Sequence, residues 1–535
     1  MPLPPKNTVW PPKELELVTG TLDVWSAWYG GSGDDLARIY GGAHDYGQYP
    51  ANRPSQYRGG VVGWAARTFW GTPTPQGEKR AKLHAPLAGD IATKSSKLLF
   101  AESPAFVIPS SVKAAAGTGT RSGSTATQDR LNDLVDETFQ ATLLEGGEVC
   151  SGLGGVYMRV VWDRAIESKP WLDTIHADAA VPEWTYGKLK AVTFWRVLYN
   201  DGQKVWRHLE RHEPGYVLHG LYEGSQDNLG TVRPLTAHPD TKDLADVVDT
   251  GVPDRLTAVY VPNIKPAKVW RNIPAGAHLG RSDYAGQEPY LDQLDETMSA
   301  WMRDVRLAKG RAFIPEVYLD SQGPGKGATF DAEREIYSTL KMLPDASAGA
   351  QITLHQFEIR WEAHQRTALE LTTGVVRGAG YSLGTFGLAG TVAVTATEVV
   401  SQDRDSFLTR EHKILYWRSA LAYIVEVLQA VDVAQFKTAG VTPERPQIEW
   451  PDGVATDPEA LARTLQLLQA AEAVSIQTKV EMLHPEWEPK QVDEEVKRIR
   501  DDSGATTADP FEIRPPGAEG KPPGEQDPPE DRPAE

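Results

Sequence analysis

The sequence predicts an α+β fold, and three observations support this prediction. Runs with a period of two lie between residues 153 and 235 and are separated by turn residues, as in an antiparallel sheet. Apolar residues with helical spacing dominate residues 288 to 433. The chain has 535 residues, which is too long for one compact core and indicates roughly two to four structural units. The strands are expected at residues 156–162, 191–198, 205–211 and 216–221.

The N-terminal part predicts an irregular arm followed by helices. The first 60 residues are rich in Gly, Tyr, Trp and Pro, and within them only residues 15–29 have the pattern of a short helix. Residues 90–100 predict a second helix, which leads into a strand ending at Ile108. Residues 110–127 consist mostly of Ser, Thr, Ala and Gly and predict a mobile loop, and residues 128–145 predict one helix.

The centre of the chain carries a heptad-like seam on a helix over residues 288–310. Its apolar residues alternate in steps of three and four: Leu291, Leu294, Met298, Trp301, Val305 and Ala308. Such a seam is typical of an ordinary core face and equally of self-association between neighbouring copies.

A small insert and a second helix follow. Residues 311–357 begin and end with strand-like runs and contain the turn 323–327, and residues 358–377 predict a helix. Residues 378–393 are rich in glycine and uncharged, which predicts a loop.

A very long helix is expected over residues 394–433, with the apolar stripe Phe407, Ile414, Trp417, Leu421, Ile424, Val425 and Leu428. At about 1.5 Å per residue it approaches roughly 60 Å, so we expect a kink or a ring-spanning role. Thr456-Asp457-Pro458-Glu459 has the signature of a helix start, and two or three short helices are expected up to Arg500. Beyond Ser503 the chain is rich in Pro, Glu and Asp, which predicts disorder.

The formal net charge is −18, the wrong sign for a protein that grips DNA statically. Either nucleic acid is not a ligand, or it must pass without being held. The acidity is equally explained as a device that keeps a self-associating protein soluble.

Metal, cofactor and membrane sites are not expected. Cys150 is the only cysteine, which excludes an intrachain disulfide, and the twelve histidines show no ligand spacing. The first residues show no basic segment followed by an apolar run, so no signal peptide is expected, and no window offers 18 strongly apolar residues. We therefore expect a protein that is cytosolic or released in a particle.

Catalytic motifs are weak, and no catalytic residue and no enzyme activity is predicted. Residues 380–384 match the GxSxG motif of a serine hydrolase, which would use Ser382. That motif requires a strand before the serine and a helix immediately after it, whereas a helix and a loop are expected here. The glycine-rich turn 323–327 lacks the Ser or Thr that follows the lysine of a phosphate-binding loop.

Several short sequence motifs, in this order, resemble those of the Gp6-like portal proteins. This protein family occurs in siphophages, which are tailed bacteriophages. Residues 98–104 look like the family's "LLF-x-E-x-P", and Pro262-Asn263 with residues 278–283 looks like its "PN…GxSD". Residues 290–296 look like its first stem helix, and residues 395–399 are similar to its "TATEV". Residues 457–459 and 494–500 resemble its C-terminal helices, so the resemblance covers about residues 85–503.

The resemblance implies the anatomy of the portal fold, which forms closed rings of twelve subunits. Residues 1–280 would be the N-terminal arm and wing, 281–310 and 358–377 the two stem helices, and 311–357 the clip inserted between them. The other parts would be a tunnel loop at 378–393, a long wing helix with a return strand at 394–452, a helical crown at 453–503 and an acidic tail at 504–535.

The resemblance also implies roles and partners. In the stem, Leu291, Leu294, Met298, Trp301 and Val305 would pack helices and subunits. The tunnel loop would meet double-stranded DNA through Tyr381, Ser382, Leu383, Thr385, Phe386 and Leu388. The clip would dock the terminase large subunit and the head–tail connector through Phe313, Tyr318, Lys326 and Tyr337. Major capsid and scaffolding proteins would be further partners of a ring located at one capsid vertex of the virion, after assembly in the host cytoplasm.

A ring-forming capsid or connector protein that conducts no DNA is the other structural alternative. It would lack the order of helix, insert, helix, loop and long helix found here. The net charge fits a conducting channel, because acidic walls repel phosphates and keep sliding DNA centred.

Overall fold

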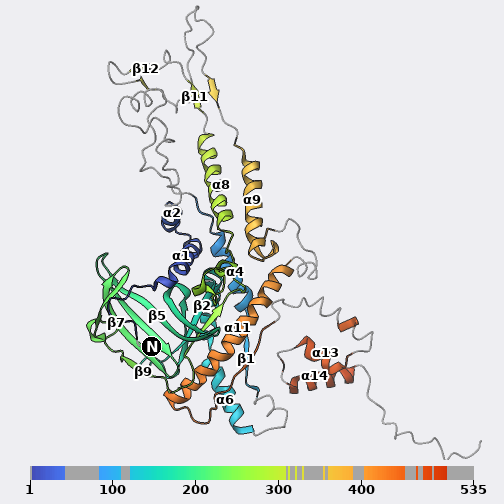
Figure 1. Cartoon of the computed structure of the whole chain (residues 1–535). Coiled ribbons are helices and arrows are strands. Elements are labelled where there is room, and N and C mark those ends of the chain that lie inside the picture. The colour runs from blue at the N-terminus through green and yellow to red at the C-terminus, as the bar shows by residue number, and fades with distance from the viewer. Residues whose placement is uncertain are drawn as a thin grey trace, which may run out of the picture. The chain divides into compact units, whose positions relative to one another are not determined.

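The structure is a computed structural model, which describes residues 3–41, 83–109, 121–308, 311–313, 320–321, 328–329, 353–355, 359–388, 403–451, 465–467, 474–484, 487 and 489–502. The chain divides into two compact units, residues 1–454 and 455–535. Figure 1 shows the order of the elements along the chain.

The N-terminal arm is more ordered than the sequence predicts. Thr8 accepts a backbone hydrogen bond from Leu229, and Trp10 is buried in a small cluster against the sheet. The expected helix at residues 15–29 is confirmed as α1, Glu16–Gly30, and a second helix, α2, Gly33–Gly41, was not expected.

The next helices correct two expectations. α4, Leu87–Phe100, and β1, Ala105–Val107, lie where the sequence predicts them. Residues 121–127, expected in a mobile loop, belong to helix α6, Arg121–Leu134, and residues 110–120 lie outside the described ranges. The single helix expected at 128–145 is two helices, because the Asp136 side chain accepts a hydrogen bond from the Phe139 N–H and begins α7, Glu137–Leu153.

The strands form antiparallel sheets, as an α+β fold requires. A three-stranded sheet has the order β10 (Ala258–Pro262), β2 (Gly155–Val161), β3 (Trp171–His176). A larger sheet has the order β4 (Ala180–Thr185), β5 (Lys188–Asn200), β6 (Val205–Glu213), β7 (Tyr216–Ser225), β8 (Asn228–Arg233), and β9 (Val247–Asp249) also pairs with β7. The four strands expected between residues 156 and 221 are confirmed as β2, β5, β6 and β7.

Two antiparallel helices rise from this body, as Figure 1 shows for α8 and α9. They are α8, Glu288–Leu307, and α9, Trp361–Gly378, and both agree with the expected helices within a few residues. At their far end β11, Arg311–Phe313, pairs with β14, Thr353–His355, and β12, Asp320–Ser321, pairs with β13, Ala328–Thr329.

The long helix is α11, Arg404–Val431, which continues into a π-helical turn, Asp432–Phe436. Six of the seven residues in the expected apolar stripe, all except Phe407, are buried, and α11 packs on β2, β10 and α4. Residues 394–402 of the expected helix lie outside the described ranges. The chain then returns through β15, Gln447–Glu449, which pairs with β1.

Residues 404–436 also form a helix long and apolar enough to cross a membrane by length and composition. The expectation that no such window exists is therefore wrong. More than half of the apolar window is buried inside the unit, as expected for a helix at the centre of a folded core.

The second unit contains the helices α13, Ile476–Leu483, and α14, Pro489–Asp502, which pack through Val480, Val492 and Val496. They confirm the prediction of short helices up to Arg500. The helix start expected at residues 456–459 and the tail 504–535 lie outside the described ranges.

Candidate functional site

The α8–α9 hairpin is held by contacts along its whole length. Near its far end the Trp301 ring stacks on His364, with centroids 6.2 Å apart. Asp304 accepts hydrogen bonds from Arg360 and from His364 Nε2, both at 2.9 Å. At its foot a Cβ added to Gly374 would lie 3.2 Å from the Tyr290 ring, so the helices approach closely there. The two helices of the hairpin are therefore held against each other both at the foot and near the far end.

The predicted seam faces inward over most of its length. Leu291 and Leu294 are buried and Met298 and Trp301 are half-buried, whereas Val305 is 42% exposed. On the same helix the buried Asp295 accepts hydrogen bonds from the Ala85 N–H and His84 Nδ1, both at 2.8 Å. The foot of the hairpin is thereby fastened to the segment that leads into α4.

The insert at the far end is described only in its short strands, β11 to β14. Phe313 lies in β11 opposite Thr353, and the structure describes its backbone but not its side chain. Tyr318, Lys326 and Tyr337 lie outside the described ranges, so their expected part in docking stays a prediction.

The segment after α9 is pinned onto α11. Thr409 donates to the Gly380 carbonyl at 2.5 Å, the Ser382 N–H donates to Ser406 Oγ at 2.9 Å, and Thr385 donates to Asp403 at 3.0 Å. Ser406 and Thr409 are three residues apart on one face of α11, and Asp403 is the residue that precedes the helix. The chain from Gly380 to Thr385 therefore follows the first turns of α11.

This anchoring corrects part of the tunnel-loop prediction. Tyr381 and Ser382 are only 2% and 7% exposed, so their side chains belong to the interior of the unit and not to a loosely packed loop. Leu383, Thr385, Phe386 and Leu388 are half-buried, and residues 389–393 lie outside the described ranges. The uncharged composition misled the prediction, because hydroxyls of α11 bond to the backbone of this segment.

Beneath the anchored segment lies a buried ion pair between Asp283 and Lys413. Lys413 Nζ donates to Asp283 Oδ2 at 2.6 Å, to Ser95 Oγ at 2.5 Å and to the Tyr381 hydroxyl at 3.0 Å. Further donors to the Asp283 carboxylate are the Tyr381 hydroxyl at 2.8 Å, Ser151 Oγ at 2.5 Å and Asn263 Nδ2 at 2.7 Å. These six residues come from six segments, so the network joins the start of the hairpin, the anchored segment and α11.

Both charged groups of the pair have hydrogen-bond partners despite their burial. Desolvation raises the pKa of the Asp283 carboxyl, but the Lys413 charge and the donated hydrogen bonds outweigh it, so that pKa lies below its ordinary value. A buried pair of this kind adds little net stability, but removing one partner leaves an uncompensated charge. The ion pair was not predicted from the sequence. Residues 278–283 were noted only as part of a family motif, and Lys413 looks like a surface lysine on a long helix.

The serine-hydrolase alternative has no geometric support. α9 and not a strand precedes Ser382, and the short 3₁₀ turn Gly384–Phe386 follows it. Within the described ranges the hydrogen bond of Ser382 is made by its backbone N–H, and no histidine contacts its hydroxyl. Among the residues that the structure describes, none is placed as the base that would activate this serine.

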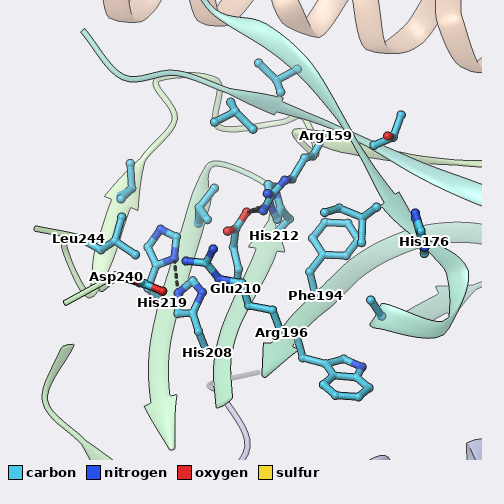
Figure 2. Close-up of a pocket in the computed structure, with 18 of the residues that line it drawn as sticks. Arg159, His176, Phe194, Arg196, His208, Glu210, His212, His219, Asp240 and Leu244 are labelled. Atoms are coloured by element: carbon cyan, nitrogen blue, oxygen red, sulfur yellow. Dashed lines mark hydrogen bonds and ion pairs between the residues drawn. The ribbon is translucent and has the colours of Figure 1, made fainter. Parts of the chain in front are cut away.

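A separate pocket of about 480 Å³ opens between the two larger sheets (Figure 2). Arg159 bridges Asp173 and Glu210, and His212 Nε2 lies 2.8 Å from the same Glu210 carboxylate. His208 and His219 stack, with Nε2 and Nδ1 3.2 Å apart. Burial lowers the pKa of His208 to about 4 and lowers the pKa of His219. Both imidazoles are therefore neutral at neutral pH.

The pocket was not expected, although a signal for it is present. Residues 208, 210 and 212 alternate along β6, so their side chains point to one face of the sheet. Among the described residues no group of three or more His, Cys, Asp or Glu side chains is arranged to hold a metal ion.

Comparison with known proteins gives distant likenesses. No family model and no curated protein matches the sequence. A solved structure described as the neck of a native GTA particle computed with C12 symmetry is 12% identical at a TM-score of 0.39, covering 74% of this chain and 89% of that chain. A second, the neck of an empty GTA particle computed with C6 symmetry, is 14% identical at a TM-score of 0.39, covering 81% and 95%. At these scores and identities the likenesses are too distant to assign a function.

Proposed function

We propose that this chain is the subunit of a portal ring, a conduit through which double-stranded DNA enters and leaves a phage-like capsid. The observation that carries the proposal is the braced α8–α9 hairpin, which holds an insert at its far end and returns through a segment anchored on α11. The same order of parts carries the sequence resemblance to portal proteins.

The hairpin supports ring formation. Copies in a ring meet through two different faces, and such a heterologous contact forms a ring when the rotation between copies closes. Four large apolar side chains on the hairpin are more than a third exposed in the single chain: Tyr290, Val305, Trp361 and Leu369. Neighbouring hairpins would cover them.

The charge of the chain supports passage of DNA without retention. A net charge of −18 repels phosphates, whereas a cationic channel would hold them. In this proposal the insert docks the terminase large subunit during packaging and the head–tail connector afterwards. The ring would sit at one capsid vertex and contact the major capsid and scaffolding proteins.

Replacing residues 314–352 with a short Gly-Ser turn tests the conduit function. Phe313 and Thr353 are partners in the β11–β14 ladder, so a tight turn can join them without disturbing the hairpin. We expect rings of normal size and particles that contain almost no DNA, because the motor has lost its docking site. A matched control puts the same turn between Asn200 and Lys204, at the end of β5.

The measurement is the DNA content of assembled particles. Full packaging by the variant without the insert would contradict the docking role and favour a ring protein that conducts no DNA. Loss of packaging in the control as well would mean that the assay reports only misassembly.

A further inference from the structure

A second cleft, of about 830 Å³, lies at the foot of the hairpin. Its walls come from α1, the segment 264–269, the turn leading into α8, the end of α9 and the outer side of α11. The hydrogen-bond network around Asp283 lies in the interior, and the cleft is a surface feature that the network does not use.

The charge of the cleft is opposite to that of the chain. Lys265, Lys268 and Arg281 line it, and among its described lining residues the only carboxylate is that of Glu288. Glu288 Oε1 accepts a hydrogen bond from Trp25 Nε1 at 3.0 Å. No carboxylate within the described ranges forms an ion pair with any of the three cations.

Lys265 is the most informative of these cations. It is half-buried, and burial lowers the pKa of its ammonium group. A desolvated cation without a counter-charge costs free energy, and a carboxylate brought into the cleft would offset that cost.

We propose that this cleft binds a carboxylate side chain of a neighbouring copy of the chain, and that Lys265 is its principal partner. This inference rests on the proposed ring. A chain of net charge −18 offers many carboxylates to its neighbour, and the cleft is concave enough to admit a side chain. Duplex DNA carries its phosphates on a convex surface and would touch the rim of the cleft more readily than its floor.

Carbodiimide cross-linking of the purified full-length protein tests the contact, because this reagent joins a lysine amine directly to a touching carboxylate. Isotopically labelled and unlabelled subunits are mixed before assembly, so that mass spectrometry separates links between copies from links within one chain. We expect Lys265 to be joined to an Asp or Glu of another copy. The exposed Lys188, at the start of β5, is the control lysine and should form no such link.

A variant gives a second measurement. Lys265→Met keeps most of the side-chain volume and removes the charge, and it should raise the concentration for half-assembly by about tenfold or more. Lys265→Arg should restore assembly and Lys188→Met should leave it unchanged. Thermal unfolding of the dissociated subunit shows whether Lys265→Met is folded.

The outcomes separate this inference from the proposed function. Rings that form without a Lys265 link between copies, and that Lys265→Met does not weaken, overturn the inference alone. Protection of Lys265 from amine-reactive labelling by a short DNA duplex, without a link between copies, overturns it in favour of a phosphate site. Failure of the protein to assemble at any concentration overturns both.

Discussion

Lys413 and Asp283 are 1% and 0% exposed, and the Lys413 ammonium group compensates the charge of the buried Asp283 carboxylate. Lys413→Met would leave the Asp283 carboxylate buried without a cation, although Tyr381, Ser151 and Asn263 still donate to it. We expect a loss of about 3–5 kcal/mol in the free energy of unfolding, measured by denaturant titration.

The double variant Asp283→Asn with Lys413→Met is the matched control. It removes both charges, so it should be more stable than Lys413→Met alone. A loss below about 1 kcal/mol for the single variant would mean that water or another group already neutralises Asp283.

His208 gives the larger sheet a pH-dependent stability. Its pKa is about 4 in the folded chain, below the ordinary value of 6.5, so the unfolded chain binds more protons between these values. His208 therefore contributes on the order of 3 kcal/mol to the free energy of unfolding. This contribution is complete above about pH 6.5 and is lost as the pH falls towards 4. The pKa of Glu210 is also lowered, although burial alone raises it, because His212 and Arg159 stabilise the carboxylate, so acid acts in the same direction.

The measurement is the melting temperature at pH 7 and pH 5 for the wild type and for His208→Gln. The wild type should lose more stability on acidification than the variant, which has no imidazole at that position. Equal losses would show that the stacked histidines do not couple to folding.

At the scale of the element, α8 offers a comparison between two positions of one seam. Leu294 is buried and Val305 is 42% exposed. Leu294→Asp should destabilise the subunit by several kcal/mol, because it buries an unpaired charge. Val305→Asp should leave the subunit folded and weaken assembly, as size-exclusion chromatography with light scattering would show.

Normal rings from Leu294→Asp would mean that the hairpin does not need its seam. If Val305→Asp assembles like the wild type, the exposed end of the seam is not a contact between copies.

Substitutions in the segment after α9 should impair the passage of DNA without lowering the stability of the subunit. Gly387 is exposed and has φ +69°, and among the described residues no atom lies within 4 Å of an added Cβ, so none of them stands in the way of a large side chain. Gly387→Asn tolerates that backbone conformation and is the control for Gly387→Trp. We expect Gly387→Trp and Leu383→Glu to form rings, with packaged DNA shortened severalfold. Encapsidated DNA of wild-type length in both would rule out a channel role for this segment.

The periodic elements could be predicted from the sequence, and the tertiary contacts could not. The period of two at β2, β5, β6 and β7 and the apolar stripe of α11 indicate both the element and its buried face. The break before α7 was missed because the apolar spacing continues through it, although Asp136 carries the signal of a helix start. The first half of α6, residues 121–127, was missed because its Ser, Thr and Gly residues favour a loop. In the second half the Gln128 side chain holds the helix to the chain around β1 through hydrogen bonds with the Phe106 carbonyl and the Ile108 N–H.

The same holds for the candidate site: its regular elements could be predicted from the sequence and its tertiary contacts could not. The two hairpin helices and the base of the insert could be placed from spacing and turn residues. The partners of Asp283 and of Tyr381 could not, because the network joins positions up to 318 residues apart in sequence with no local pattern between them: Lys413 bonds to Ser95 and to Asp283.

At the scale of the whole molecule, the acidic tail should be dispensable for folding and assembly. Residues 504–535 have too few apolar side chains to bury, so we expect deletion of 506–535 to leave the melting temperature and the ring unchanged. Loss of rings after the deletion, with a folded subunit, would show that the tail is an assembly element.

Electron microscopy of the purified full-length protein in negative stain tests the central claim most directly. We expect closed rings with a central hole, of twelve subunits if the resemblance to portal proteins holds, with the hairpins arranged around the channel. A protein that remains monomeric at high concentration, or one that forms rings without an opening, would contradict the proposal of a DNA conduit.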